Sequence, residues 1–258
     1  MTLTPAEIAA MEQAIVRGWP ALETANIDGW LARWSSGGSL RANSVAALAF
    51  TGTDIDLTLA KVVHFYRQHG GIPRFTITDI AAPAGLDALL EARGWRRTGD
   101  NVAYAKSVGG KTVGGNGAEP AAAADVRIEL RALPTADWSQ IYLSGLSIDR
   151  RPVALKLVEG TPRPRVFFSG VRDRQVIASG LSVLDGELAS VQCIATHAAA
   201  RRTGAATAIV QAIEQHAVAN GVRRLYLQTE AANTAALRIY ERLGFRLAGR
   251  YHTRELRP

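Results

Sequence analysis

The fold is decided by the stretch HAAARRTGAA, residues His197–Ala206. An apolar run at 188–196 precedes it and predicts a strand, and a helical pattern with Ile209 and Ile213 on one face follows it. The first N–H groups of a helix lack partners within it, and the helix dipole favours an anion there. Gly204 lets the backbone approach a ligand closely. The stretch predicts either a phosphate-binding loop or a small-residue loop that packs a helix onto a sheet.

Length and composition narrow the class of protein. The 258 residues suffice for one large domain or two of ordinary size, and 47% hydrophobic with 21% charged residues is typical of a globular chain. A single cysteine, Cys193, excludes an internal disulfide and a cysteine-based zinc site, so we expect no metal. The sequence contains neither a long apolar run nor a signal-peptide pattern. These absences predict a cytoplasmic protein with no membrane partner.

The positive charge is concentrated in the second half. Residues 126–258 hold 19 of the 30 Lys and Arg but only 11 of the 23 Asp and Glu, so this half carries +8 and the remainder −1. Nearly all of the excess is arginine, which binds phosphate through two parallel hydrogen bonds. This favours a phosphorylated ligand or nucleic acid, although a solvated basic surface has the same composition.

The order of the patterns predicts an α/β fold with a mixed, mostly antiparallel sheet flanked by helices. In the first half, a helix from about Thr4 to Gly18 precedes an antiparallel hairpin of Trp30–Trp34 and Leu40–Val45. The segment 107–125 has five glycines and an alanine run, which predicts a flexible linker. We therefore predict domains at 1–106 and 126–258.

The two halves resemble each other at an offset of 150 residues. Gly94 matches Gly244, Gly71 matches Gly221, and Phe75 matches Leu225. Glycines that recur at element ends without a gap indicate a tandem duplication of a helix–strand–helix–strand unit.

The duplication fails at the position of the phosphate-binding pattern. Opposite Arg201–Ala206 the first half has Thr51–Asp56, which contains Asp54 and Asp56 and no arginine. Carboxylates repel a phosphate, so the first half is predicted to keep the scaffold without the ligand site.

A second pattern follows at Asn233–Phe245, where Ala236, Leu237 and Tyr240-Glu-Arg-Leu-Gly lie between the two ends. Together with RRTGAA at 201–206, it makes residues 126–258 resemble the GCN5-related N-acetyltransferase (GNAT) superfamily. Its members transfer an acyl group from acyl-CoA, usually to an amine. The whole chain resembles tandem proteins of this superfamily in which one half has lost its cofactor site. The resemblance implies two GNAT-like domains, the first degenerate.

The resemblance also implies where acetyl-CoA binds. The 201–206 loop would hold the pyrophosphate and the preceding strand end the pantetheine arm and thioester, with two further residues on the later helix. The implied cofactor-binding residues are Cys193, Ile194, Ala195, Thr196, Arg201, Arg202, Thr203, Gly204, Ala205, Ala206, Asn233 and Tyr240.

Asn233 and Tyr240 lie seven residues apart, two helical turns, and so share one helix face. Tyr240 resembles the superfamily tyrosine that protonates the departing thiolate, a role that a phenol can fill. Each residue also has a structural reading, Asn233 as a helix N-cap and Tyr240 as a core aromatic.

The general base is left open by the sequence. Some relatives carry a glutamate at the position of Ser190, and Glu187 lies three residues earlier. We select Glu187 as the catalytic carboxylate, with Glu230 and His252 as alternatives.

These observations predict an N-acetyltransferase that moves acetyl from acetyl-CoA to a small-molecule amine. A non-catalytic acyl-CoA sensor or partner-binding module is the alternative. No basic run interleaved with aromatics supports nucleic-acid binding. We expect a monomer or homodimer.

The first half, with the polar segment Arg41–Ser44 near Trp30 and Trp34, is predicted to help wall the acceptor site.

Overall fold

A single long sheet runs through both halves of the chain. The structure is a computed structural model that describes residues 3–109 and 125–257. Most of the predicted linker, 110–124, lies outside the described residues. The strands follow the order β1-β2-β3-β4-β12-β5-β11-β9-β8-β7-β6, and β10 pairs with β8. The β3–β4 and β9–β11 pairs are parallel and the other pairs antiparallel, so the expected mixed, mostly antiparallel α/β fold is confirmed.

The elements have the following bounds. The α-helices are α1 (Pro5–Gly18), α2 (Ile55–Gln68), α3 (Leu86–Ala92), α4 (Ala136–Ser144), α5 (Arg151–Glu159), α6 (Ala205–Ala219) and α7 (Thr234–Arg242). The strands are β1 (Glu23–Ile27), β2 (Trp30–Trp34), β3 (Val45–Ala46), β4 (Arg74–Thr78), β5 (Arg96–Ser107), β6 (Arg127–Arg131), β7 (Arg165–Arg172), β8 (Gln175–Asp185), β9 (Leu188–Ser190), β10 (Gln192–Thr196), β11 (Arg224–Glu230) and β12 (Arg246–Glu255). Short 3-10 helices are η1 (Leu40–Asn43), η2 (Ile148–Arg150) and η3 (Ala198–Ala200).

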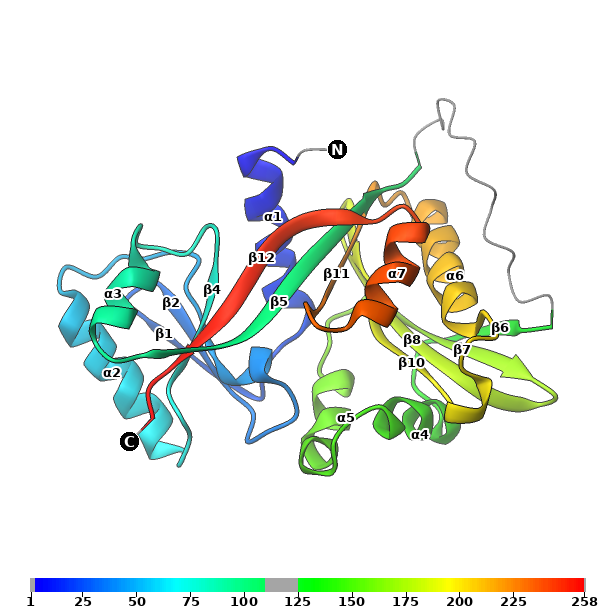
Figure 1. Ribbon diagram of the computed structural model, residues 1–258, viewed down its shortest axis with the longest axis horizontal. Coiled ribbons are helices and arrows are strands. Elements are labelled where there is room, and N and C mark those ends of the chain that lie inside the picture. The colour runs from blue at the N-terminus through cyan, green and yellow to red at the C-terminus, as the bar shows by residue number, and fades with distance from the viewer. Residues whose placement is uncertain (1–2, 110–124, 258) are drawn as a thin grey trace.

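The last strands of the two halves are exchanged. β12, from the end of the chain, lies between β4 and β5, and β5 lies between β12 and β11. Figure 1 shows these two long strands side by side, extending from one half into the other. Each half therefore completes its sheet with a strand that the other half supplies.

The 150-residue repeat is visible in the elements. β4, α3 and β5 of the first half recur as β11, α7 and β12 of the second, with Arg74 and Arg224 both opening their strands. Gly94 and Gly244 both have positive φ, +81° and +89°, just after the helices α3 and α7 end. A left-handed residue at this position favours glycine because it has no Cβ.

The predicted antiparallel pairing of Trp30–Trp34 with the segment Leu40–Val45 is confirmed only at its end, where β2 pairs with β3 through Leu31 and Ala46. The tight hairpin joins β2 to β1, across a turn at Asp28 and Gly29, both with positive φ. Residues Leu40–Asn43 form a 3-10 helix because the Asn43 amide donates to the carbonyls of Gly37 and Ser39 and its oxygen accepts from the Ser35 N–H. This turn holds Arg41 at the junction of the two halves.

α1 also joins the halves, because it packs beside the strands of the second one. Its residues Met11, Ala14 and Ile15 share a buried cluster with Ala103, Ala105 and Tyr226. The Tyr226 hydroxyl donates to the Ala14 carbonyl at 3.0 Å. The N-terminal helix is thus part of the wall behind β11.

Candidate functional site

Two neighbouring strands of the second half separate at the centre of the molecule. β9 pairs in parallel with β11 as far as Ser190 and Tyr226, and the Val191 N–H donates to the Tyr226 carbonyl at 2.8 Å. Beyond this point β10 pairs with β8 alone, and its register is irregular between Gln192 and Ala195. Cys193, inside the irregularity, has a φ of +54°. In the described chain, no strand occupies the edge of β10 that faces β11.

The loop before α6 has the geometry of an anion site. Gly204 is the N-cap residue of α6 and has a φ of +86°. Because glycine has no side chain, it offers no hydrogen-bond acceptor to the first N–H groups of the helix. Arg202 also has a positive φ, +64°, and both it and Arg201 are exposed. The Thr203 hydroxyl donates to the Ala200 carbonyl at 2.8 Å and so shapes the loop. Free helix amides next to two arginines suit a pyrophosphate.

The helix α7 presents Asn233 and Tyr240 to the same space. Asn233 is the N-cap, and its Oδ1 accepts from the Ala236 N–H at 3.3 Å. Tyr240 is 8% exposed and packs against Phe245, with 5.9 Å between ring centroids. Burial raises the pKa of Tyr240 to about 12, so its hydroxyl stays protonated and can donate a hydrogen bond. Asn233 is thus a helix N-cap and Tyr240 a buried core aromatic, as the structural alternatives predicted. Neither position prevents the residue from contacting a ligand in the same space.

These parts line one cleft of about 1390 Å³. It extends from the α6 loop, along β10, to the point where β10 and β11 separate. Of the residues expected to bind the cofactor, those that line it are Cys193, Ile194, Ala195, Thr196, Arg201, Arg202, Gly204, Ala205, Ala206, Asn233 and Tyr240. Thr203 does not line the cleft, and its hydroxyl bonds to the Ala200 carbonyl within the loop.

The candidate bases do not reach this cleft. Glu187 lies in the exposed turn between β8 and β9, where its Oε1 is 3.0 Å from Nε of Arg223. The Nε2 atom of His252 is 2.8 Å from Oδ1 of Asp87, and Glu230 is exposed at the end of β11. Ser190 is fully buried, and its hydroxyl accepts from the Val183 N–H. The structure thus brings together most of the residues expected to bind the cofactor but none of these carboxylates or imidazoles.

Of the predicted segment Arg41–Ser44, Arg41 lines the cleft, together with Ile15 of α1 and Gln228 of β11, which the sequence analysis did not single out. Arg41, from η1, donates to Oε1 of Gln228 at 2.8 Å, and its guanidinium lies 5.3 Å from the Trp19 ring centroid. Gln192 lines the cleft with a buried Oε1 that accepts no hydrogen bond from the described residues. No sequence signal links Arg41 to Gln228, because 187 residues separate them.

The described residues include no group of His, Cys, Asp and Glu arranged for a metal ion. They also include no helix with the length and apolar character needed to span a membrane.

Comparison with known proteins agrees with this geometry. A solved GCN5-related N-acetyltransferase from Kribbella flavida superimposes with a TM-score of 0.70 at 16% identity, over 100% of this chain and 97% of that one. A tandem GNAT protein from the clavulanic acid biosynthesis pathway gives a TM-score of 0.59 at 16% identity, over 83% of this chain and 75% of that one. The fold is therefore that of a tandem GNAT protein.

The chain belongs to the family described as "Probable histone acetyltransferase Rv0428c C-terminal", whose model matches residues 5–254. It is also similar to the "Uncharacterized N-acetyltransferase YobR" of Bacillus subtilis (strain 168). The two are 27% identical over 259 residues, which cover 96% of this chain and 98% of that relative.

Proposed function

We propose that the protein transfers the acetyl group of acetyl-CoA to a primary amine of a small molecule, with the cleft as its cofactor site. The observation that carries the proposal is the convergence of three features on one cleft. These are the uncapped start of α6 with Arg201 and Arg202, the edge of β10 without a strand partner, and the Tyr240 hydroxyl. When bound, acetyl-CoA supplies a thioester that an amine can attack.

The residues of the cleft fit acetyl-CoA with its pyrophosphate at the start of α6 and its thioester near the separation of β10 and β11. The α6 amides and the two arginines hold the pyrophosphate at the helix end. The open edge of β10, from Cys193 to Thr196, offers backbone groups to the pantetheine amides and the thioester oxygen. The orphaned Oε1 of Gln192 is a further acceptor at the strand separation. Tyr240 donates its hydroxyl proton toward the sulfur as the thiolate leaves.

The test is release of free CoA thiol when the purified protein is mixed with acetyl-CoA and a panel of amines. We expect amine-dependent release and the acetylated amine by mass spectrometry. A lysine-containing histone tail peptide belongs in the panel, because the family description names a histone acetyltransferase. Transfer to the peptide alone would contradict the small-molecule acceptor and retain the reaction. Saturable acetyl-CoA binding without transfer to any acceptor would favour the non-catalytic sensor.

A further inference from the structure

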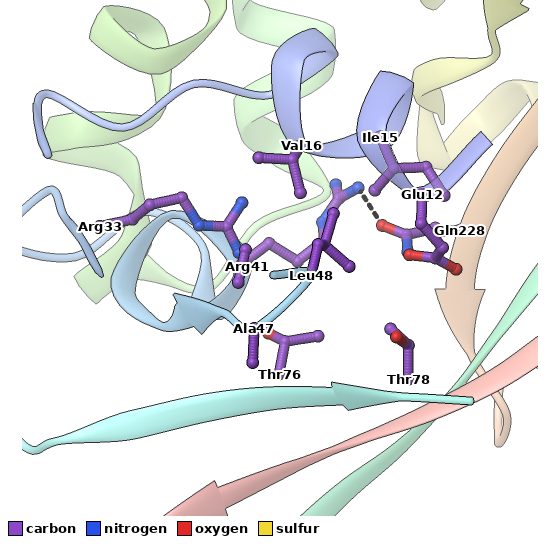
Figure 2. A pocket seen from close by; sticks show the side chains of 11 residues that line it. Glu12, Ile15, Val16, Arg33, Arg41, Ala47, Leu48, Thr76, Thr78 and Gln228 are labelled. Carbon is purple, nitrogen blue, oxygen red and sulfur yellow. Dashed lines mark hydrogen bonds between the residues drawn. The ribbon is translucent and has the colours of Figure 1, made fainter. Parts of the chain in front are cut away.

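A small chamber lies between the halves, next to the separation of β10 and β11. It is lined by α1, β2, η1, the segment around β3, β4 and β11 (Figure 2). Its volume of about 20 Å³ accommodates a group the size of one water molecule or one ammonium head. Ile15, Arg41 and Gln228 line both this chamber and the cleft. The chamber therefore adjoins the cofactor site from the side of the first half.

The carboxyl group of Glu12 is the acidic group of this chamber. Glu12 comes from α1 and is 5% exposed. Within residues 3–109 and 125–257 nothing hydrogen-bonds or ion-pairs with its carboxylate. Leaving a carboxylate buried without a partner is costly, so such groups are rare outside functional sites. A buried carboxylate on the wall of a chamber of this size suits a small group that can hydrogen-bond to it or exchange a proton with it.

Two arginines and a hydroxyl that is unpaired among the described residues lie elsewhere on the chamber wall. Arg33 is 3% exposed and donates to the carbonyl and hydroxyl of Ser44, and Arg41 donates to Gln228. Neither arginine forms an ion pair with a carboxylate in the described part of the chain. The Thr78 hydroxyl, also on the chamber wall, is buried and has no partner there.

Two guanidinium groups on the chamber wall favour the uncharged form of an amine, which is the form that attacks a thioester. Burial, with a smaller contribution from Asp79, raises the pKa of Glu12 to about 7. Tyr251 on β12 also interacts electrostatically with Glu12. A carboxylate with a pKa close to the working pH suits proton transfer in either direction.

We propose that this chamber receives the amine of the acceptor and that Glu12 accepts its proton. The inference rests on the proposed function and names the acceptor end of the same site. The catalytic base is then Glu12 on α1 of the first half, in place of Glu187, which the sequence analysis selected.

The reaction balances with these groups. The amine nitrogen forms a bond to the acetyl carbon and loses a proton to the Glu12 carboxylate. The carbon–sulfur bond breaks, its electron pair stays on sulfur, and the sulfur takes a proton from the Tyr240 hydroxyl. Solvent removes the proton from Glu12 and returns one to Tyr240.

Glu12→Gln tests the proposal with methylamine and acetyl-CoA as probes. We expect kcat/KM for methylamine to fall by about a hundredfold or more while the acetyl-CoA Kd stays within about twofold. In the wild type, kcat/KM rises with pH through a midpoint near 7, and the variant loses this midpoint. Glu12→Ala regains activity on addition of sodium formate, a carboxylate small enough for the enlarged chamber, and Glu12→Asp keeps part of the activity.

Glu7→Gln is the matched control. Glu7 lies on the same helix, pairs with Arg224 at 2.7 Å, and lines neither the chamber nor the cleft. We expect its activity and pH midpoint to match the wild type. If Glu12→Gln retains activity within about threefold and keeps the midpoint, the assignment of Glu12 is wrong while the proposed function stands. If the wild type releases no thiol with methylamine or any other amine, both fail.

Discussion

The exchange of Glu12 for glutamine should make the folded protein more stable above neutral pH. The carboxyl is 5% exposed, and its pKa rises from 4.5 in an unfolded chain to about 7 in the fold. The unfolded state is therefore more ionised than the folded state between pH 4.5 and about 7, and both are ionised at higher pH. The free-energy cost of keeping the ionised carboxylate buried is therefore absent below pH 4.5, grows between 4.5 and 7, and is complete above about 7. The fold thus loses stability as this carboxyl ionises, whereas a salt-bridged carboxylate gains stability for the fold when it ionises.

The size of the effect follows from the two pKa values. At 1.36 kcal/mol for each tenfold change, the ionised Glu12 costs the fold about 3 kcal/mol at pH 8 and less than about 1 kcal/mol at pH 5. Glutamine has nearly the same shape and no charge, so Glu12→Gln recovers this amount. In a chain of this size, about 3 kcal/mol corresponds to roughly 6–12 °C in Tm.

Urea unfolding followed by circular dichroism at pH 5, 6, 7 and 8 measures the difference. We expect the two proteins to be within about 1 kcal/mol at pH 5 and to diverge as the pH rises. Glu7→Gln is the control of opposite sign. The Thr4 N–H and then Arg224 lower the pKa of Glu7 to about 2. The ionised Glu7 carboxylate stabilises the fold fully above its unfolded pKa of 4.5, and this stabilisation is lost as the pH falls through about 2. The Glu7→Gln variant is therefore expected to be less stable than the wild type at pH 8. A Glu12→Gln variant that is less stable than wild type at pH 8, or whose difference does not change with pH, would refute an unpaired buried charge.

Further predictions concern the cleft and the domain exchange. Tyr240→Phe should lower kcat for acetyl transfer at least about tenfold with little change in the acetyl-CoA Kd; unchanged turnover would remove Tyr240 from the reaction. Arg202→Ala should raise that Kd about tenfold by isothermal titration, whereas Arg223→Ala, on the surface beside Glu187, should not. Asn233→Ala should cost about 1 kcal/mol of stability in thermal unfolding, because it removes the α7 N-cap. Expressed alone, residues 126–258 should fail to give a cooperative unfolding transition, since β5 and α1 are missing; a folded, active fragment would contradict this.

The residues proposed to bind the cofactor were predicted from the sequence, and most of them line one cleft, because this part of the structure is built locally. The loop Arg201–Gly204 lies between η3 and α6, and a glycine before a helix favours the left-handed geometry that leaves helix amides free. Asn233 and Tyr240 share a face by helical periodicity alone. The sequence also predicted the duplication, because equivalent turns need glycine at equivalent positions.

The segment Leu40–Asn43 was predicted as a strand and forms a 3-10 helix. The difference comes from the Asn43 side chain, which competes for backbone groups and turns the chain. Apolar alternation carries no information on such a side-chain bond. The consequence is functional, since the turn directs Arg41 to Gln228.

The sequence by itself determined the α/β class, the tandem duplication and the pattern by which the second half resembles an acyl-CoA site, because each depends on spacing within a few dozen residues. Only the tertiary structure decided that β5 and β12 exchange places between the halves. It also decided that Glu12 and Arg41 from the first half meet Gln228 from the second around one chamber. These contacts join positions roughly 190 to 220 residues apart, and long-range packing of this kind leaves no periodic signal in a single chain.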